Sequence, residues 1–156
     1  MNLYFLRHGE ADWPNWKGSD DERPLTERGV KEMQKVADFL KQLEISLDQI
    51  VTSPLPRAEQ TAEIVAEKLR LKLREDRILQ KGFDISGLKR LLGKYPGNSV
   101  MLVGHDPDFT EAISALTGAN LKLSKAGLAL VDLDQDLMQG RLLWLVPPKI
   151  ARKCAE

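Results

Sequence analysis

The chain has 156 residues, with 23 Lys and Arg against 23 Asp and Glu, so its formal net charge is zero. This length predicts one domain over residues 1–156 with a core of its own, and the balanced charge argues against a nucleic-acid-binding protein. The single cysteine, Cys154, excludes an intrachain disulfide and a cysteine-rich zinc site, so we expect a reducing, cytoplasmic location.

The first predicted element is a strand at Asn2–Arg7, an apolar run that stops before Gly9. Apolar residues on both faces are typical of a strand buried inside a parallel sheet. This run is too short for a signal-peptide core, and no window of the chain approaches the ~20 apolar residues of a membrane-spanning helix. We therefore expect no membrane partner. A polar, turn-rich loop follows at Glu10–Pro24 and contains Trp13 and Trp16.

After this loop, helical and extended patterns alternate. Thr26 is a suitable N-cap for a helix whose apolar residues recur every three or four positions up to Leu43. The later elements are a strand at Asp48–Thr52, a helix after Pro56, an edge-type strand at Leu71–Arg74, a helix at Ile85–Tyr95, a strand at Val100–Val103, a helix at Asp108–Leu116 that ends at Gly118, and a hairpin of strands at Leu128–Leu133 and Arg141–Val146. Strands separated by helices predict a three-layer α/β sandwich.

A charged tail follows the hairpin. It contains Lys149, Arg152 and Lys153, and we interpret it as a solvated end.

Polar clusters directly follow three of the predicted strands. They are Arg7-His8-Gly9-Glu10, the segment Ser53–Thr61, and Gly104-His105-Asp106-Pro107. In α/β sheets, ligands bind at the carboxyl ends of the strands, so side chains from these clusters are predicted to line one pocket. The candidates for that pocket are Arg7, His8, Arg57 and His105.

These residue types suit a phosphoryl group. An arginine binds phosphate oxygens through a planar, permanently charged fork. A neutral histidine can act as a nucleophile and form a covalent intermediate, and a second, protonated histidine can stabilise the charge of the transition state. Either histidine alone would read as an ordinary hydrogen-bonded polar residue, but both histidines of the chain follow strands that meet at one sheet edge.

The clusters, in this order, resemble the histidine phosphatase superfamily, which includes the phosphoglycerate-mutase-like enzymes. Arg7-His8-Gly9 resembles the family signature, Arg23-Pro24-Leu25-Thr26 with Gly29 its next block, Ser53-Pro54-Leu55 with Arg57–Thr61 its second phosphate-pocket block, and Gly104-His105 its second catalytic histidine. The small size and the segments Gly104–Phe109 and Ser124–Leu133 look most like bacterial SixA-type phosphohistidine phosphatases.

The resemblance implies a single histidine phosphatase domain, an α/β/α sandwich on a mixed, mostly parallel sheet. It implies that His8 is the nucleophile and becomes a phosphohistidine. Arg7 and Arg57 would bind the phosphoryl oxygens, and His105 would stabilise the transferring group. It also implies catalysis with no metal and no cofactor.

The proton donor for the leaving group stays open. Larger members of the family carry an acidic donor after the third strand, where this chain reads Ile78–Asp84 with no glutamate. An alkoxide leaving group needs such a donor, which is typically worth ~10²–10⁴ in rate. The protonated form of imidazole has a pKa of roughly 6.5, so imidazole can leave as a largely neutral ring without a dedicated donor. The candidates for an acid are Asp106, Asp84 and Glu10. Asp106 can equally cap the helix at Pro107, and Glu10 can be a solvated loop charge.

Three functions follow from this reading. The first is hydrolysis of protein phosphohistidine through a covalent intermediate at His8. The second is a phosphomonoesterase acting on a small phosphorylated metabolite, and the third is a catalytically weak module that binds phosphoproteins. The chain has no long insertion to cover the pocket, which favours a macromolecular substrate. Trp13 and Trp16 either border the mouth of the pocket or pack half-buried on the sheet.

Overall fold

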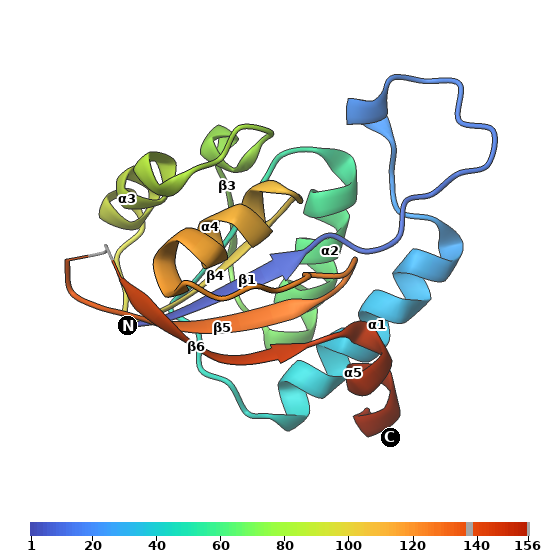
Figure 1. Ribbon diagram of the computed structural model, residues 1–156. Coiled ribbons are helices and arrows are strands. Elements are labelled where there is room, and N and C mark those ends of the chain that lie inside the picture. The colour runs from blue at the N-terminus through green and yellow to red at the C-terminus, as the bar shows by residue number, and fades with distance from the viewer. Residues whose placement is uncertain (137–138, 156) are drawn as a thin grey trace.

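The computed structural model describes residues 1–136 and 139–155. Within these residues, six strands form one sheet in the order β3-β2-β4-β1-β5-β6 (Figure 1). The strands are β1 Asn2–Arg7, β2 Gln49–Thr52, β3 Leu73–Glu75, β4 Ser99–Gly104, β5 Leu128–Leu133 and β6 Gly140–Val146. The helices are α1 Glu27–Gln42, α2 Pro56–Leu69, α3 Ile85–Lys94, α4 Asp108–Thr117 and α5 Pro148–Cys154, with 3-10 turns η1 at Asp20–Glu22 and η2 at Arg77–Leu79.

The sheet is mixed, with its parallel part running from the edge strand β3 through β2 and β4 to β1. Strand β1 pairs in parallel with β4 and antiparallel with β5, and β2 runs parallel to both of its neighbours, β3 and β4. The late hairpin adds the antiparallel pair of β5 and β6. The predicted mixed, mostly parallel α/β/α sandwich is confirmed, and β3 lies at the sheet edge as its alternating pattern indicated.

Helices cover both faces of the sheet, and strand β1 shows why its sequence is apolar throughout. Leu3 and Phe5 face the core formed with α3 and α4, whereas Tyr4 and Leu6 face the core formed with α1, α2 and α5. All four side chains are buried. A strand between two helical layers has no solvent face, so alternation is lost.

The C-terminal tail corrects the sequence interpretation. Lys149, Arg152 and Lys153 are exposed, but they belong to helix α5, which packs against α1. Ala151 is buried in the core, and the Arg152 guanidinium lies 2.6 Å from the Glu32 carboxylate of α1. The three charged side chains are therefore solvated, as the sequence indicated, but they lie on a helix that was not predicted from the sequence. No described helix is both long and apolar enough to cross a lipid bilayer.

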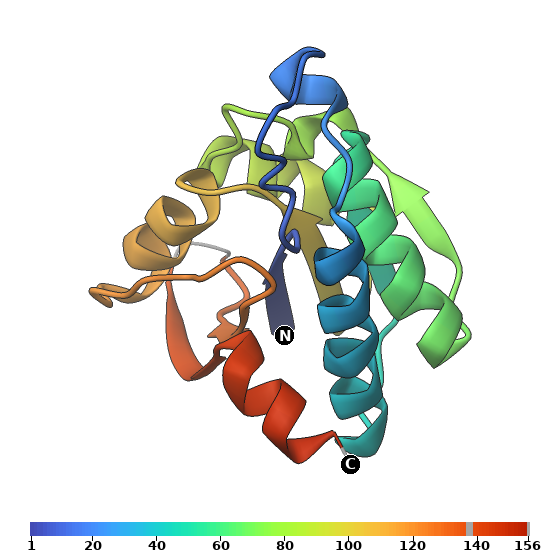
Figure 2. The same cartoon turned by 90° about the vertical axis from the view of Figure 1, so that its right-hand side faces the viewer.

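The loop between β1 and α1 projects beyond the carboxyl end of β1 (Figures 1 and 2). Its return into α1 requires Gly29, because a Cβ there would lie 2.2 Å from the Glu10 carbonyl oxygen. Thr26 caps α1 by accepting a hydrogen bond from the Gly29 N–H at 3.0 Å, as its sequence position indicated. The chain that follows His8 is thus held closely against the start of α1.

Candidate active site

The parallel register at the centre of the sheet brings the two histidines together. Arg7 of β1 is paired with Gly104 of β4, so the residues that follow these strands are neighbours. The ring centroids of His8 and His105 lie 5.4 Å apart, and both side chains are buried. Ser53 follows β2, the other neighbour of β4, and its hydroxyl contacts the His105 ring.

His8 is held in one orientation by its own backbone turn. Its Nδ1 lies 2.7 Å from the Gly9 carbonyl oxygen. A carbonyl only accepts, so Nδ1 carries the hydrogen and the lone pair of a neutral ring is left on Nε2. Burial, followed by electrostatic repulsion from His105, Arg57 and Arg7, lowers the pKa of His8 to about 3, although the hydrogen bond to the Gly9 carbonyl opposes this. The ring is therefore neutral at pH 7.

His105 is held from a different strand. Its Nε2 lies 2.8 Å from the Ser53 hydroxyl, and its buried Nδ1 has no hydrogen-bond partner among the described residues. Burial, followed by the charges of Arg57 and Lys81, lowers the pKa of His105 to about 4. The sequence interpretation assigned a proton to this residue. In this structure His105 is neutral at pH 7, and a bound anion would have to raise its pKa before it carried that proton.

Each arginine is anchored by one terminal nitrogen to a main-chain carbonyl of a loop distant in sequence. Arg7 Nη1 donates to the Leu123 carbonyl at 2.9 Å, and Arg57 Nη1 donates to the Asp20 carbonyl at 2.8 Å. The Nε atom of each is buried and unpartnered among the described residues. A guanidinium has five N–H donors, so both arginines keep donors that an anion can use. Both guanidinium charges help to lower the pKa of His8, so both arginines lie within electrostatic range of that ring.

The carboxylates of the three candidate acids all accept hydrogen bonds from nearby residues. The Asp106 carboxylate accepts the N–H and hydroxyl hydrogens of Thr110 at 2.9 and 2.8 Å, so it caps the first turn of α4. Asp84 accepts the Gly87 N–H at 2.8 Å and caps α3. Glu10 is half-buried and accepts the Thr26 hydroxyl hydrogen at 2.9 Å, so its interpretation as a solvated loop charge is wrong.

Sequence reasoning missed Asp20 and Lys81 as neighbours of the site. Asp20 Oδ1 lies 2.8 Å from Arg23 Nη2, and Asp20 Oδ2 lies 3.0 Å from Lys81 Nζ and 3.5 Å from Arg57 Nη2. Hydrogen bonds from Lys81 and Arg23 hold the pKa of the Asp20 carboxyl well below its usual range. In the sequence, Asp20 is one of several acidic residues in a polar loop, and no local signal distinguishes it.

Trp13 and Trp16 lie in this loop and not on the sheet. They are 40% and 37% exposed, and neither belongs to a core cluster. Their indole N–H groups donate to the carbonyls of Pro24 and Ser19, both at 2.8 Å. Together with Asp20 and the rest of the loop they line a hollow of about 630 Å³. Of the two interpretations of the tryptophans, packing on the sheet is wrong.

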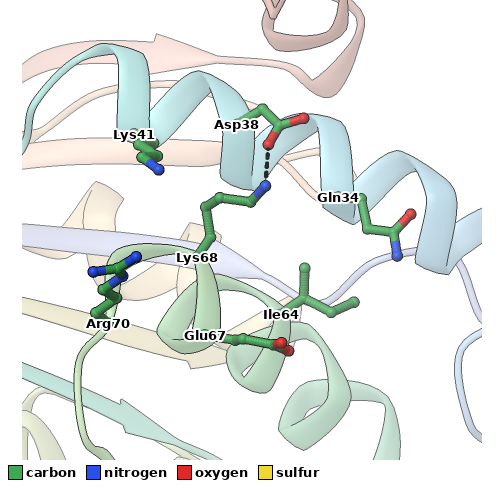
Figure 3. Close-up of a pocket in the computed structure, with 7 residues that line it drawn as sticks. All are labelled: Gln34, Asp38, Lys41, Ile64, Glu67, Lys68 and Arg70. Atoms are coloured by element: carbon green, nitrogen blue, oxygen red, sulfur yellow. Dashed lines mark ion pairs between the residues drawn. The ribbon is translucent and has the colours of Figure 1, made fainter.

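A second hollow, of about 510 Å³, lies between α1 and α2 (Figure 3). It is lined by Gln34, Asp38, Lys41, Ile64, Glu67, Lys68 and Arg70, and an ion pair of 2.5 Å joins Lys68 to Asp38. None of its lining residues follows a strand of the sheet, so it is separate from the histidine site. Within the described residues, no group of three or more His, Cys, Asp and Glu could hold a metal ion.

Comparisons with known proteins point to one family. The family model described as "Histidine phosphatase superfamily (branch 1)" matches residues 3–81. An uncharacterized protein of Picosynechococcus sp. is 38% identical over 136 residues, which is 82% of each chain. Phosphohistidine phosphatase SixA of Escherichia coli is 38% identical over 71 residues, 46% of this chain and 43% of that protein.

A solved structure resembles the whole chain. The structure of the protein histidine phosphatase SixA complexed with tungstate matches with a TM-score of 0.83 and 27% identity, over 96% of this chain and 98% of that chain. The structural match is therefore nearly complete, whereas the sequence match to E. coli SixA spans less than half of either protein.

Proposed function

This chain belongs to the histidine phosphatase superfamily, and on that basis we propose that it is a phosphatase that hydrolyses protein phosphohistidine through a covalent intermediate on His8. The observation that carries this proposal is the state of His8. Its ring is neutral, its Nδ1 hydrogen is bound to the Gly9 carbonyl, and its Nε2 lone pair is available beside Arg57 and His105. This is the state in which an imidazole attacks phosphorus.

In the first step, His8 Nε2 attacks the phosphorus of the substrate. The new P–N bond forms as the P–N bond to the substrate imidazole breaks. The substrate ring, protonated on its other nitrogen, takes the electron pair of the broken bond and leaves as a neutral imidazole. Arg7 and Arg57 bind the phosphoryl oxygens through the donors that their loop carbonyls do not use. Their permanent charge stabilises the phosphoryl group in the transition state.

In the second step, water attacks the phosphorus of phospho-His8. The P–N bond breaks, its electron pair returns to Nε2, and the surplus proton of the water leaves to solvent. His105 faces the same group from β4, and the dianionic phosphoryl raises its pKa toward the charged form. The Ser53 hydroxyl keeps the His105 ring in place during both steps.

Two observations support phosphohistidine as the substrate. The carboxylates of Asp106, Asp84 and Glu10 are all engaged in local hydrogen bonds, which leaves no dedicated acid among these candidates. Imidazole is the leaving group that needs one least, because its conjugate acid has a pKa of roughly 6.5. The E. coli relative named phosphohistidine phosphatase agrees with this choice, and the expected partner is a phosphorylated protein.

A direct comparison of substrates tests the proposal. The protein is incubated with a histidine-phosphorylated protein, with p-nitrophenyl phosphate and with small phosphorylated metabolites, and kcat/KM is measured for each. We expect the highest value for the histidine-phosphorylated protein. A higher value for a metabolite would replace this proposal with the phosphomonoesterase, and binding of the phosphoprotein without turnover would favour a recognition module.

A further inference from the structure

We infer that Asp20 is a positioning residue for Arg57, and that Lys81 holds Asp20 in this role from the other side of the site. The inference deepens the proposed function, because it rests on Arg57 binding the transferred phosphoryl group. Neither Asp20 nor Lys81 belongs to the strand-end clusters that identify the site.

The contacts of the Arg57 guanidinium carry this inference. Arg57 is 3% exposed, and its guanidinium donates to Asp20: Nη1 to the carbonyl oxygen at 2.8 Å and Nη2 to Oδ2 at 3.5 Å. The chain separation is large, since Asp20 lies in η1 and Arg57 in the first turn of α2. The direction of the guanidinium therefore depends on where the loop places Asp20.

The loop itself is held by the Asp20 carboxylate. Oδ1 accepts from Arg23 Nε and Nη2 at 3.2 and 2.8 Å, and the third nitrogen of Arg23 donates to the Ala11 carbonyl. Arg23 thereby joins Asp20 to Ala11, near the start of the loop. With the carboxylate fixed, the Asp20 carbonyl is presented to Arg57 at a defined position.

Lys81 supplies the second attachment. It lies in the turn between η2 and α3, and its Nζ is 3.0 Å from Asp20 Oδ2 and 3.3 Å from Asp21 Oδ1. Asp20 thus connects this turn, the loop after β1 and the start of α2. Removing Lys81 should loosen Asp20, and through Asp20 it should loosen Arg57.

Three cations surround the Asp20 carboxylate. It pairs with Arg23, Arg57 and Lys81, while Lys81 also pairs with Asp21 and Arg23 also pairs with Asp12. Asp20 is ionised because its pKa lies below the usual range, which makes it unsuitable as a proton donor. Its chemistry suits orientation of a cation and not acid catalysis.

The test uses orthovanadate as the phosphoryl analogue, together with p-nitrophenyl phosphate turnover. We compare Asp20→Ala and Asp20→Asn with the matched control Asp21→Asn, which alters a Lys81 contact but none of the Arg57 hydrogen bonds. Misplacement of a binding group can cost up to ~100-fold, so we expect Asp20→Ala to weaken vanadate binding and lower kcat/KM by roughly 10- to 100-fold. Asp20→Asn should fall between Asp20→Ala and the wild type. Asp21→Asn should stay within about threefold of the wild type, as for a surface ion pair.

A double-mutant cycle with Lys81→Met separates positioning from a general structural effect. If Lys81 acts through Asp20, its substitution should reduce vanadate affinity in the wild type and have no further effect in Asp20→Ala. Unchanged or tighter vanadate binding by Asp20→Ala would overturn the inference, as would additive losses in the cycle. An Arg57→Ala variant that binds vanadate like the wild type would overturn the proposed site as well, so the two failures are distinguishable.

Discussion

The rings of His8 and His105 lie 5.4 Å apart at an angle of 55°, yet they are held by different parts of the fold. His8 is oriented by the carbonyl of the next residue, whereas His105 is oriented by Ser53 from a neighbouring strand. One ring is therefore held by its own turn and the other by the sheet. This difference suggests separate substitutions for each role.

His8→Ala should abolish turnover and the acid-labile phosphoenzyme, because it removes the Nε2 atom that attacks phosphorus. Labelled phosphohistidine protein and quenched gels measure the phosphoenzyme, and circular dichroism checks that the fold is retained. A variant that keeps wild-type turnover would exclude the covalent mechanism.

Ser53→Ala should lower kcat through a less ordered His105 ring. Loss of one hydrogen bond of about 1 kcal/mol corresponds to roughly fivefold in rate. Ser53→Thr keeps a hydroxyl at this position and is the matched control. An equal loss of kcat in both variants would show that the Ser53 hydroxyl does not orient His105 for catalysis.

Asp106→Asn, Asp84→Asn and Glu10→Gln should each leave hydrolysis of phosphohistidine largely unchanged. A working general acid would instead cost ~10²–10⁴ in rate. Asn is about as good a helix cap as Asp, so we expect the first two variants to change the free energy of unfolding little in urea titrations. A large loss of turnover in one variant would identify the proton donor.

Stability should fall as the pH drops from 7 toward 4. The folded pKa values of His8 and His105, about 3 and about 4, lie below the usual 6.5. Each buried histidine therefore contributes stability that is fully present above pH ~6.5 and is lost as the pH falls, because the unfolded chain takes up protons first. The slope is about 1.4 kcal/mol per pH unit for each histidine between these values.

Urea titrations of the wild type and His105→Gln at pH 7 and pH 5 measure this slope. The variant should lose less stability than the wild type over that interval, since one titrating group has been removed. Parallel pH dependences would show that His105 is not buried in its neutral form.

Hydrolysis of phosphohistidine should continue unchanged in excess EDTA. Arg7 and Arg57 supply the positive charge that a metal ion provides in other phosphatases. Rates measured with EDTA and with added Mg²⁺ check this. Loss of activity that Mg²⁺ restores would contradict the prediction of a metal-independent reaction.

Local patterns were sufficient to predict most of the fold. The apolar run of β1 and the cap at Thr26 depend on neighbours along the chain, and both are found where expected. Helix α5 was missed because it is only seven residues long, and its contacts are with α1. A short helix of this kind is stabilised by packing and not by its own periodicity.

The sequence by itself determined the α/β class and the candidate histidines and arginines, because residues that follow parallel strands must emerge at the same edge of the sheet. Only the tertiary structure decided how these side chains are held. The bond from His105 to Ser53, the attachment of Arg57 to Asp20 and the contact of Asp20 with Lys81 all join segments distant in sequence. The states of the two histidines depend on burial and on charges from several elements, and these exist only in the folded chain.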